Sequence, residues 1–258
     1  MLQVLIHRCL LLAVTGVGLI TVEARSEEVR IAVAANFLEP LRALQPVFEE
    51  SYSHRMLITS GSTGLLFAQI RNGAPFDVLL AADSERPQKL AAEGFGDESQ
   101  VFTYANGRLA LWSAVAGRID DSTLAALDSE QFRWLAIAEP ATAPYGAAAR
   151  QVLERLGVWE SLQQRLVKGH SVAQTFAMIE TGNAELGIIA LSQALAYDGE
   201  SSYIAISQAL HEPIRQDAMV LNRGIDNPAA REFATFLLSP VATAIIEKRG
   251  YIVPRQQL

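Results

Sequence analysis

The sequence has almost no cysteine, no excess of positive charge and a large share of hydrophobic residues. Its 258 residues include one cysteine, Cys9, so a framework of paired disulfides is excluded. Lysine and arginine number 21 against 28 aspartate and glutamate residues, which gives a net charge of −7. This balance argues against a nucleic-acid partner, which requires a basic face. Because half of the residues are hydrophobic, we expect a globular protein stabilised by its core alone.

Short enzyme motifs are also missing. The chain has no GxSxG nucleophile elbow, no GxxxxGK[ST] phosphate loop, no HExxH and no CxxC. The four histidines are scattered, and only His170 lies beside a turn that could line a ligand cleft. A hydrolase or dehydratase needs a titratable group close to the reacting atom. We interpret His170 as an exposed loop residue, and the sequence favours a protein that holds its ligand unchanged.

The first 24 residues have the pattern of a secretory signal peptide. A weakly basic start precedes an apolar run from Cys9 to Val22, and a small-residue cleavage site ends at Ala24. The run is short for a membrane span, which needs about 20 apolar residues. A retained N-terminal anchor is the alternative. We expect an exported, periplasmic protein that is cleaved near Ala24 and has no cysteine in its mature chain.

Strands and helices alternate from Val29 onward, and the rhythm restarts near Leu109. The first segments read as a strand over 29–34, a helix over 38–52 that Pro46 should kink or shorten, a strand over 55–60, a helix over 64–73 and a strand over 76–83. Such alternation is typical of a mainly parallel sheet with helices on both faces. We expect an α/β fold of two lobes with a ligand cleft between them, residues 25–106 plus 217–258 forming lobe I and residues 107–216 forming lobe II.

Four turns at the expected carboxyl ends of strands share one chemical character. They contain hydroxyls, a side-chain amide and backbone N–H groups, but no lysine or arginine, and they cover residues 34–36, 61–63, 143–146 and 169–172. Ligands of open α/β sheets bind at this edge, and helix N-termini receive anions well. Taken singly, Asn36, Ser62 and Ser171 could be simple N-caps. Taken together, the four turns predict an anion site built from neutral donors.

The order of these segments resembles the periplasmic molybdate-binding proteins that supply ABC transporters. The resemblance runs from about Val29 to Tyr251 and is most specific in Ser60–Asp83, with "GAPFDVLLAAD", and in "PYGAAARQVLERLG". It implies a type II periplasmic-binding-protein fold whose lobes close over a tetrahedral oxyanion, molybdate or tungstate. It also implies a monomer with no enzymatic activity and no cofactor, which delivers its ligand to a membrane permease.

Carried over by position, the resemblance assigns oxyanion binding to six residues. Asn36 stands where the first strand's turn supplies a ligand, and Ser62 and Thr63 form a hydroxyl pair in which Thr63 makes the usual side-chain contact. Tyr145 and Val172 open helices at places where a backbone N–H is offered, and the small Ala35 lets the backbone approach the ligand. The metal atom itself would have no direct protein ligand.

Two departures from the family pattern concern the same pocket. Many members have a tyrosine at the position of Ala190, and a serine is common at the position of Asn36. We therefore expect a rearranged pocket in which the hydroxyl of Tyr145 compensates for the absent phenol. Three alternatives stay open: a receptor for sulfate or another small oxyanion, a periplasmic enzyme on the same scaffold, and a sensory or adhesive module that binds a partner protein.

Overall fold

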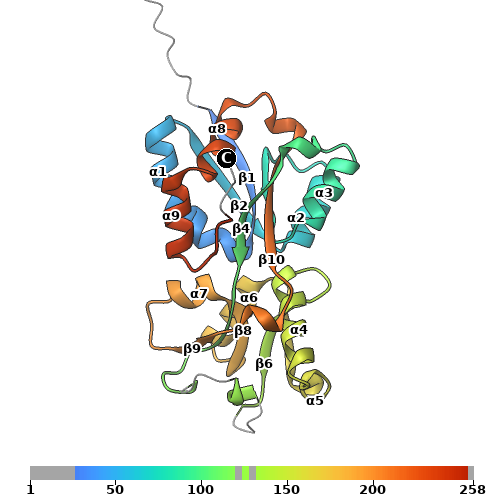
Figure 1. Ribbon diagram of the computed structural model, residues 1–258, viewed down its shortest axis with the longest axis vertical. Coiled ribbons are helices and arrows are strands. Elements are labelled where there is room, and N and C mark those ends of the chain that lie inside the picture. Colours follow the sequence, from blue (N-terminus) through green and yellow to red (C-terminus); the bar gives the residue numbers. More distant parts are fainter. Residues whose placement is uncertain (1–26, 120–123, 128–131, 255–258) are drawn as a thin grey trace, which may run out of the picture.

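The computed structural model describes residues 27–119, 124–127 and 132–254. The predicted signal peptide, with its cleavage position near Ala24, lies outside the described residues. Two lobes are stacked along the long axis of the molecule, and each contains a sheet flanked by helices (Figure 1). We refer to the lobe that contains the first strand as the first lobe and to the other as the second lobe.

The first lobe is built on a five-stranded sheet in the order β2-β1-β3-β10-β4. Strand β1 pairs in parallel with β2 and β3, whereas β10 pairs antiparallel with β3 and β4. The strands are β1 (Glu28–Ala34), β2 (Arg55–Gly61), β3 (Val78–Leu80), β4 (Val101–Gly107) and β10 (Ile214–Val220). The helices are α1 (Leu38–Tyr52), α2 (Thr63–Arg71), α3 (Glu85–Ala92), α8 (Pro228–Leu237) and α9 (Pro240–Lys248).

Both faces of the first sheet are buried. Val29, Ile31 and Val33 of β1 join a core with α1, α8 and α9, while Ala32 faces a second core with α2 and α3. Side chains alternate along a strand, so a strand covered on both faces needs an almost continuous apolar run. This explains why β1 was readable from sequence. Helix α1 continues through the exposed Pro46 to Tyr52, so the expected shortening does not occur.

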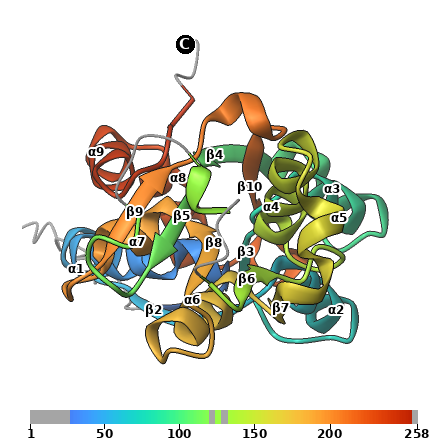
Figure 2. The same ribbon diagram turned by 90° about the horizontal axis from the view of Figure 1, so that it is seen from below.

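The second lobe has a five-stranded sheet in the order β7-β6-β8-β5-β9. Strand β6 pairs in parallel with β7 and β8, and β5 pairs antiparallel with β8 and β9. The strands are β5 (Leu109–Ser113), β6 (Leu135–Ala138), β7 (Leu166–Gly169), β8 (Leu186–Ala190) and β9 (Ser202–Ala205). The helices are α4 (Pro144–Arg155), α5 (Trp159–Leu162), α6 (Val172–Glu180) and α7 (Leu191–Ala196). Seen from below, α4 and α5 lie on one side of β5 and β8, and α7 lies on the other (Figure 2).

Short 3-10 turns complete the described part of the chain. The first of them, η1 (Ala35–Phe37), connects β1 to α1 and matters for the site. The others are η2 (Glu98–Gln100), η3 (Ala125–Leu127), η4 (Gln163–Arg165), η5 (Gln208–Leu210) and η6 (Asn222–Gly224). No single helix among the described residues is long and apolar enough to cross a membrane. Helices α8 and α9, bent by 62° at their junction, meet the length and composition requirement only as a pair.

The predicted two-lobed α/β fold is confirmed, with one refinement. Each sheet is mixed, with two parallel and two antiparallel pairings, because β10 and β5 run against their neighbours. The chain passes between the sheets after Gly107 and again before Ile214. These two passages place the ends of β1, β2, β6 and β7 at the junction of the lobes.

Candidate functional site

A small cavity lies between the lobes. It has a volume of about 200 Å³ including the open space at its mouth. It is lined by Ala34, Ala35, Asn36, Ser62, Thr63, Ala82, Ala143, Pro144, Tyr145 and Val172. The structure therefore brings together all six residues that the sequence assigned to one site. None of the lining residues has a carboxylate, ammonium or guanidinium group, and His170 is an exposed loop residue, as interpreted from sequence.

The first lobe presents two hydroxyls at the start of α2. Thr63 is 1% exposed, and its Oγ1 accepts a hydrogen bond from the backbone N–H of Ala82 at 3.0 Å. Ser62 is the N-cap of α2, and its Oγ accepts from the N–H of Leu65 at 3.3 Å. A hydroxyl that accepts one hydrogen bond keeps its own hydrogen for donation. Both side chains therefore retain a donor for a ligand. Ser62 is also an N-cap, which was the alternative interpretation of this residue from the sequence.

Three helices direct their first turns at the cavity. Thr63, Tyr145 and Val172 are the first or second residues of α2, α4 and α6. The first N–H groups of a helix have no acceptor inside that helix, and within the described part of the protein these three donate to no other group. Helix N-termini also have a partial positive charge. Their convergence gives the cavity an anion-attracting character without any cationic side chain.

Side-chain amides and phenols behind the cavity form contacts that the sequence did not indicate. The Asn36 amide donates to Gln216 Oε1 at 2.9 Å, and Gln216 Nε2 donates to the Tyr145 hydroxyl at 3.0 Å. Asn36 is not an N-cap, because it lies inside η1, whose N-cap is Ala34, and the N-cap of α1 is Phe37. The Tyr145 hydroxyl is held by protein groups, which corrects the expectation that it replaces the absent phenol at Ala190. Gln216, Ser192 and Tyr251 were missed because they belong to no local motif.

Glycines allow close backbone contacts around the cavity. The N–H of Gly64 donates to the carbonyl of Thr142 in the second lobe at 3.1 Å, and a Cβ on Gly64 would lie 2.8 Å from that oxygen. Gly146 lets α4 pack on β6, since a Cβ there would lie 2.2 Å from the carbonyl of Ala138. The first contact links the lobes, and the second fixes the helix that presents Tyr145.

Comparison with known proteins identifies the family. A family model described as bacterial extracellular solute-binding protein matches residues 29–252. The chain belongs to this family. It is 46% identical over 244 residues to the molybdate-binding protein ModA of Azotobacter vinelandii. The alignment covers 93% of this chain and 96% of the relative. The chain is 43% identical to ModA of Rhodobacter capsulatus, with coverage of 89% and 90%.

A solved structure gives the same result. The Azotobacter vinelandii periplasmic molybdate-binding protein superimposes with a TM-score of 0.83 at 38% identity, covering 88% of this chain and 100% of that one. The predicted resemblance is confirmed. Solute-binding proteins of this kind are the substrate-binding components of transporters, with no enzymatic activity and no cofactor, and membership implies export from the cytoplasm.

The phenols near the cavity of this solute-binding protein are neutral donors and acceptors. Burial raises the pKa of Tyr251 to about 12 and raises the pKa of Tyr145 and Tyr104 well above the usual value for tyrosine. No phenolate forms at neutral pH, so these hydroxyls neither repel an anion nor compensate its charge. The electrostatic attraction of the site comes from the helix N-termini and hydroxyls alone.

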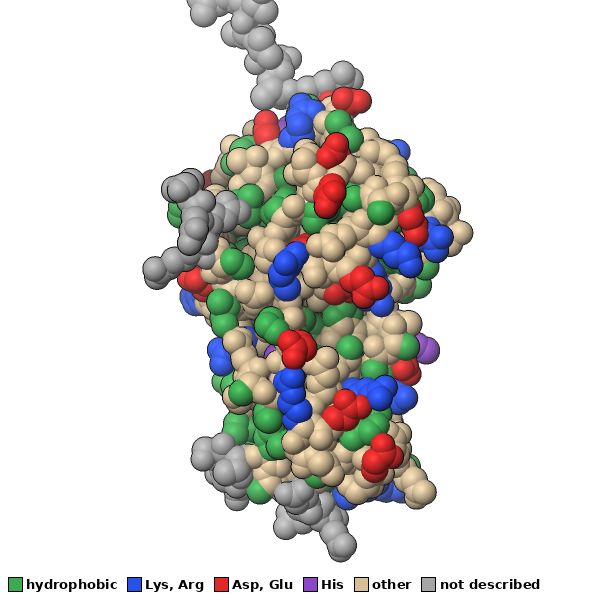
Figure 3. All heavy atoms as spheres, turned by 45° about the vertical axis from the view of Figure 1, so that its right-hand side comes forward, with side chains coloured by type: hydrophobic (Ala, Val, Ile, Leu, Met, Phe, Trp, Pro, Cys, Tyr) green, Lys and Arg blue, Asp and Glu red, His purple; other side chains and the backbone are tan. Residues whose placement is uncertain are grey.

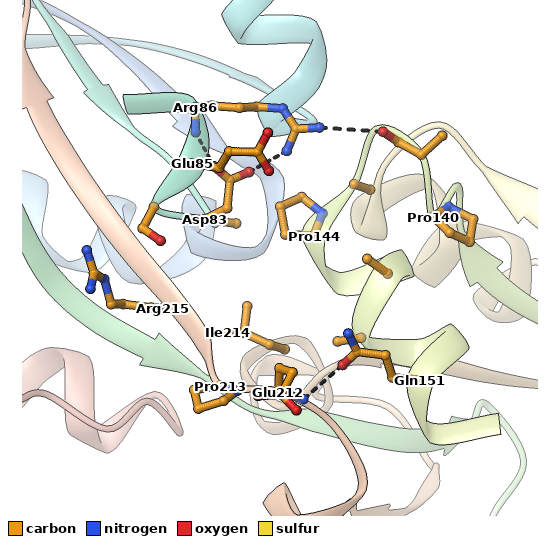
Figure 4. Close-up of a pocket in the computed structure, with 16 residues that line it drawn as sticks. Asp83, Glu85, Arg86, Pro140, Pro144, Gln151, Glu212, Pro213, Ile214 and Arg215 are labelled. Atoms are coloured by element: carbon orange, nitrogen blue, oxygen red, sulfur yellow. Dashed lines mark hydrogen bonds and ion pairs between the residues drawn. The ribbon is translucent and has the colours of Figure 1, made fainter. Parts of the chain in front are cut away.

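A larger cleft adjoins the cavity on the side of α3 and α4 (Figure 4). It shares Ala82, Ala143 and Pro144 with the cavity, and its volume measured in the same way is about 880 Å³. Its charged lining is mixed: Asp83 forms an ion pair with Arg86, and Arg86 reaches the carbonyl of Ala141 across the cleft at 3.5 Å. Burial raises the pKa of Asp83, although Arg86 opposes this. We interpret this cleft as the solvent-filled approach to the smaller cavity.

Proposed function

We propose that this solute-binding protein captures molybdate outside the cytoplasm and delivers it to the membrane permease of an ABC transporter. The observation that carries the proposal is the convergence of three helix N-termini and two hydroxyls on one uncharged cavity between the lobes. The near full-length identity to two molybdate-binding proteins supports the same ligand. Tungstate has the same charge and nearly the same size, so we expect it to bind in the same way.

The proposed oxyanion contacts are hydrogen bonds, with no direct bond from protein to metal. Thr63 and Ser62 donate from their hydroxyls, and the first turns of η1, α4 and α6 donate from backbone N–H groups at Ala35, Asn36, Tyr145 and Val172. Hydrogen bonds to a charged group contribute about 1.5–3 kcal/mol each. Six or seven of them would offset the cost of removing a dianion from water and ordering two lobes around it.

Neutral donors also account for selectivity. Hydrogen phosphate has an O–H that needs an acceptor, and none of the residues lining the cavity offers a carboxylate. An unmatched donor in a dry site is penalised, so phosphate should be rejected. Sulfate is fully ionised and tetrahedral, and it differs from molybdate only in its shorter bonds. We propose that the spacing of the rigid backbone N–H groups is what distinguishes these two anions.

We further propose that the protein acts as a periplasmic monomer, released by cleavage near Ala24. The expected division into lobe I (25–106 plus 217–258) and lobe II (107–216) shifts by a few residues, because Gly107 and residues 214–216 pair within the first sheet. Acidic and basic side chains are intermingled on the face shown in Figure 3, and the net charge is −7. Both observations support a protein without a nucleic-acid partner, since such partners require a concentrated basic surface.

Calorimetric titration with molybdate, tungstate, sulfate and phosphate tests the proposal. We expect tight binding of molybdate and tungstate, weak or absent binding of sulfate and none of phosphate. Equal or tighter binding of sulfate would instead indicate that Asn36 and Ala190 have retuned the pocket. If a folded protein, checked by circular dichroism, gave no heat with any of the four anions, the oxyanion function would be wrong.

A further inference from the structure

Neutral polar side chains from both lobes meet directly behind the cavity. We call them the inter-lobe cluster, and each is at most 5% exposed. From the first lobe come Asn36 of η1, Tyr104 of β4, Gln216 of β10 and Tyr251 after α9, and from the second lobe come Tyr145 of α4 and Ser192 of α7. The cluster contains no charged group, so its bonds depend on geometry and not on ionic attraction.

The Asn36 carbonyl is one centre of the inter-lobe cluster. It accepts a hydrogen bond from the Tyr251 hydroxyl at 2.6 Å and another from Ser192 Oγ at 3.1 Å. The Tyr251 and Ser192 hydroxyls are themselves 3.1 Å apart. Ser192 belongs to the second lobe, so two of these three contacts cross the junction between the lobes.

Gln216 is the other centre, and its amide is bonded at both ends. Its Oε1 accepts from the Asn36 amide at 2.9 Å and from the Tyr104 hydroxyl at 3.0 Å, while its Nε2 donates across the junction to the Tyr145 hydroxyl at 3.0 Å. An amide that is bonded through both its oxygen and its nitrogen, at 0% exposure, has one favoured orientation, because exchanging the two ends would oppose donor to donor.

The segment that leaves the first lobe at Gly107 passes in close contact with the inter-lobe cluster. Gly107 ends β4, where the chain leaves the first sheet, and a Cβ there would lie 2.2 Å from the Tyr145 hydroxyl and 2.6 Å from Gln216 Nε2. Only glycine leaves room for the Gln216–Tyr145 bond beside the passage. The bond is therefore made at the pivot about which the lobes would move.

We propose that Gln216 and Tyr251 are positioning residues that stabilise the closed arrangement of the lobes independently of the ligand. This inference rests on the proposed oxyanion function. Asn36 and Tyr145 both line the cavity, and their side chains are bonded within the inter-lobe cluster, so the cluster aligns residues from both lobes before an anion arrives. The apparent dissociation constant equals the intrinsic one divided by the fraction of protein in the binding-competent state. Weakening the cluster lowers that fraction.

Binding measurements test the first consequence. We expect Tyr251→Phe and Gln216→Met each to raise the apparent dissociation constant for molybdate about three- to tenfold, the range expected when one net hydrogen bond is lost. Tungstate should be affected by the same factor. Tyr203→Phe is the matched control, because Tyr203 is 42% exposed on β9, and it should leave the constant unchanged. Unchanged binding in Tyr251→Phe and Gln216→Met, both folded, would overturn the proposal.

Distances measured without ligand test the second consequence. Spin labels at Gln88→Cys on α3 and Glu160→Cys on α5, in the mature chain that begins after Cys9 and so has no cysteine of its own, report the separation of the lobes. We expect the ligand-free protein to populate a short distance in part, and Tyr251→Phe to shift that population toward longer distances. A ligand-free protein with no short-distance population, or a population that Tyr251→Phe does not change, would refute the role in closure.

The two measurements separate this inference from the proposed function. If molybdate gives no heat with the wild-type chain, the function fails, whatever the label distances show. If the wild type binds and Tyr251→Phe weakens binding while the ligand-free distances stay the same, Tyr251 acts through the bound ligand and the positioning role is wrong. A Ser192→Ala and Tyr251→Phe double variant should lose less than the product of the single effects, since both residues donate to Asn36.

Discussion

The first lobe brings side-chain hydroxyls to the proposed site, whereas the second lobe brings only backbone N–H groups beside apolar or aromatic side chains. Thr63 and Ser62 start α2 with polar side chains, but Pro144, Tyr145 and Val172 start α4 and α6. Both lobes still reach the cavity through the N-terminus of a helix. Hydrogen-bond donors at a helix N-terminus are therefore supplied in two ways. In the first lobe they depend on residue identity, and in the second lobe they depend on backbone position.

This difference determines how each lobe can be altered. A hydroxyl is removed by an ordinary substitution, so evolution or design can retune the first lobe one side chain at a time. The N–H groups of the second lobe remain under any substitution except proline. Their placement depends instead on how closely α4 and α6 pack on the second sheet, and Gly146 is required for the packing of α4. We expect side-chain variation in the second lobe to change the shape of the pocket more than its donors.

The largest predicted effect comes from deleting a backbone donor in the second lobe. Val172 is the first residue of α6, where proline is well tolerated because that N–H has no partner in the helix. Val172→Pro should raise the dissociation constant for molybdate about a hundredfold, since a hydrogen bond to charge is worth about 1.5–3 kcal/mol and the proline ring also crowds the anion. Calorimetric titration measures the change.

Val172→Ala is the control, because it removes the side chain and keeps the N–H. It should bind molybdate within about threefold of the wild type, since an N–H bond to charge accounts for most of the expected loss. Circular dichroism should show the same helix content in both variants. If Val172→Ala were as weak as Val172→Pro, the second lobe would contribute its side chain, and the contrast between the lobes would be lost.

The next effect concerns the hydroxyl of the first lobe. Thr63→Val keeps the shape of the side chain but removes the donor to the anion, so affinity should fall about tenfold to thirtyfold. It also leaves the N–H of Ala82 without its acceptor, and thermal unfolding should show a loss of about 1–2 kcal/mol. Thr63→Ser retains the hydroxyl and should recover most of the affinity. Wild-type affinity in Thr63→Val would remove this residue from the site.

A smaller effect is expected where the two lobes touch. Gly64→Ala places a Cβ 2.8 Å from the carbonyl of Thr142 in the second lobe, so the lobes must separate by a few tenths of an ångström. We expect molybdate affinity to fall about fivefold, while stability to heat stays the same or rises because alanine is the better helix former. Gly61→Ala, whose Cβ would meet its neighbours at 3.4 Å, is the matched control. Loss of stability in Gly64→Ala would place the strain inside the first lobe.

The sequence predicted the fold wherever strands are apolar throughout. Strand β1, an apolar run covered on both faces, was predicted over 29–34 against observed bounds of Glu28–Ala34, and the restart expected near Leu109 coincides with the start of β5. Helix α3 was missed because Glu85–Ala92 is polar on average and buries only Pro87 and Leu90. Strand β4 has no clear local signature, because its mixed polar and apolar residues pair with β10, which is distant in sequence.

The candidate site, like the fold, could be predicted from the sequence only where its signals are local. Turns with hydroxyls and glycines at strand ends are local signals, so Ser62 and Thr63 could be predicted from a few residues. Gln216 and Tyr251 lie 180 and 215 residues from Asn36, and nothing near them in sequence indicates a shared cluster. Only tertiary packing shows that the Asn36 amide is used by the protein. The donors that face a ligand are local, whereas the groups that hold those donors are not.

The smallest predicted effect is that of pH on binding, and it tests whether both lobes are neutral. Since no group lining the cavity titrates near neutrality, affinity for molybdate should stay constant between about pH 6 and pH 8. The phenols behind the cavity have a raised pKa in the folded protein, about 12 for Tyr251, against about 10 when unfolded. The folded state then holds protons that the unfolded state releases, so stability should fall as pH rises from about 10 to about 12 and not before. Thermal unfolding followed across this range, with Tyr251→Phe for comparison, should show a shallower decline in the variant. A tenfold change in affinity between pH 6 and pH 8 would instead bring a titrating group, with His170 the first candidate, into the second lobe's half of the site.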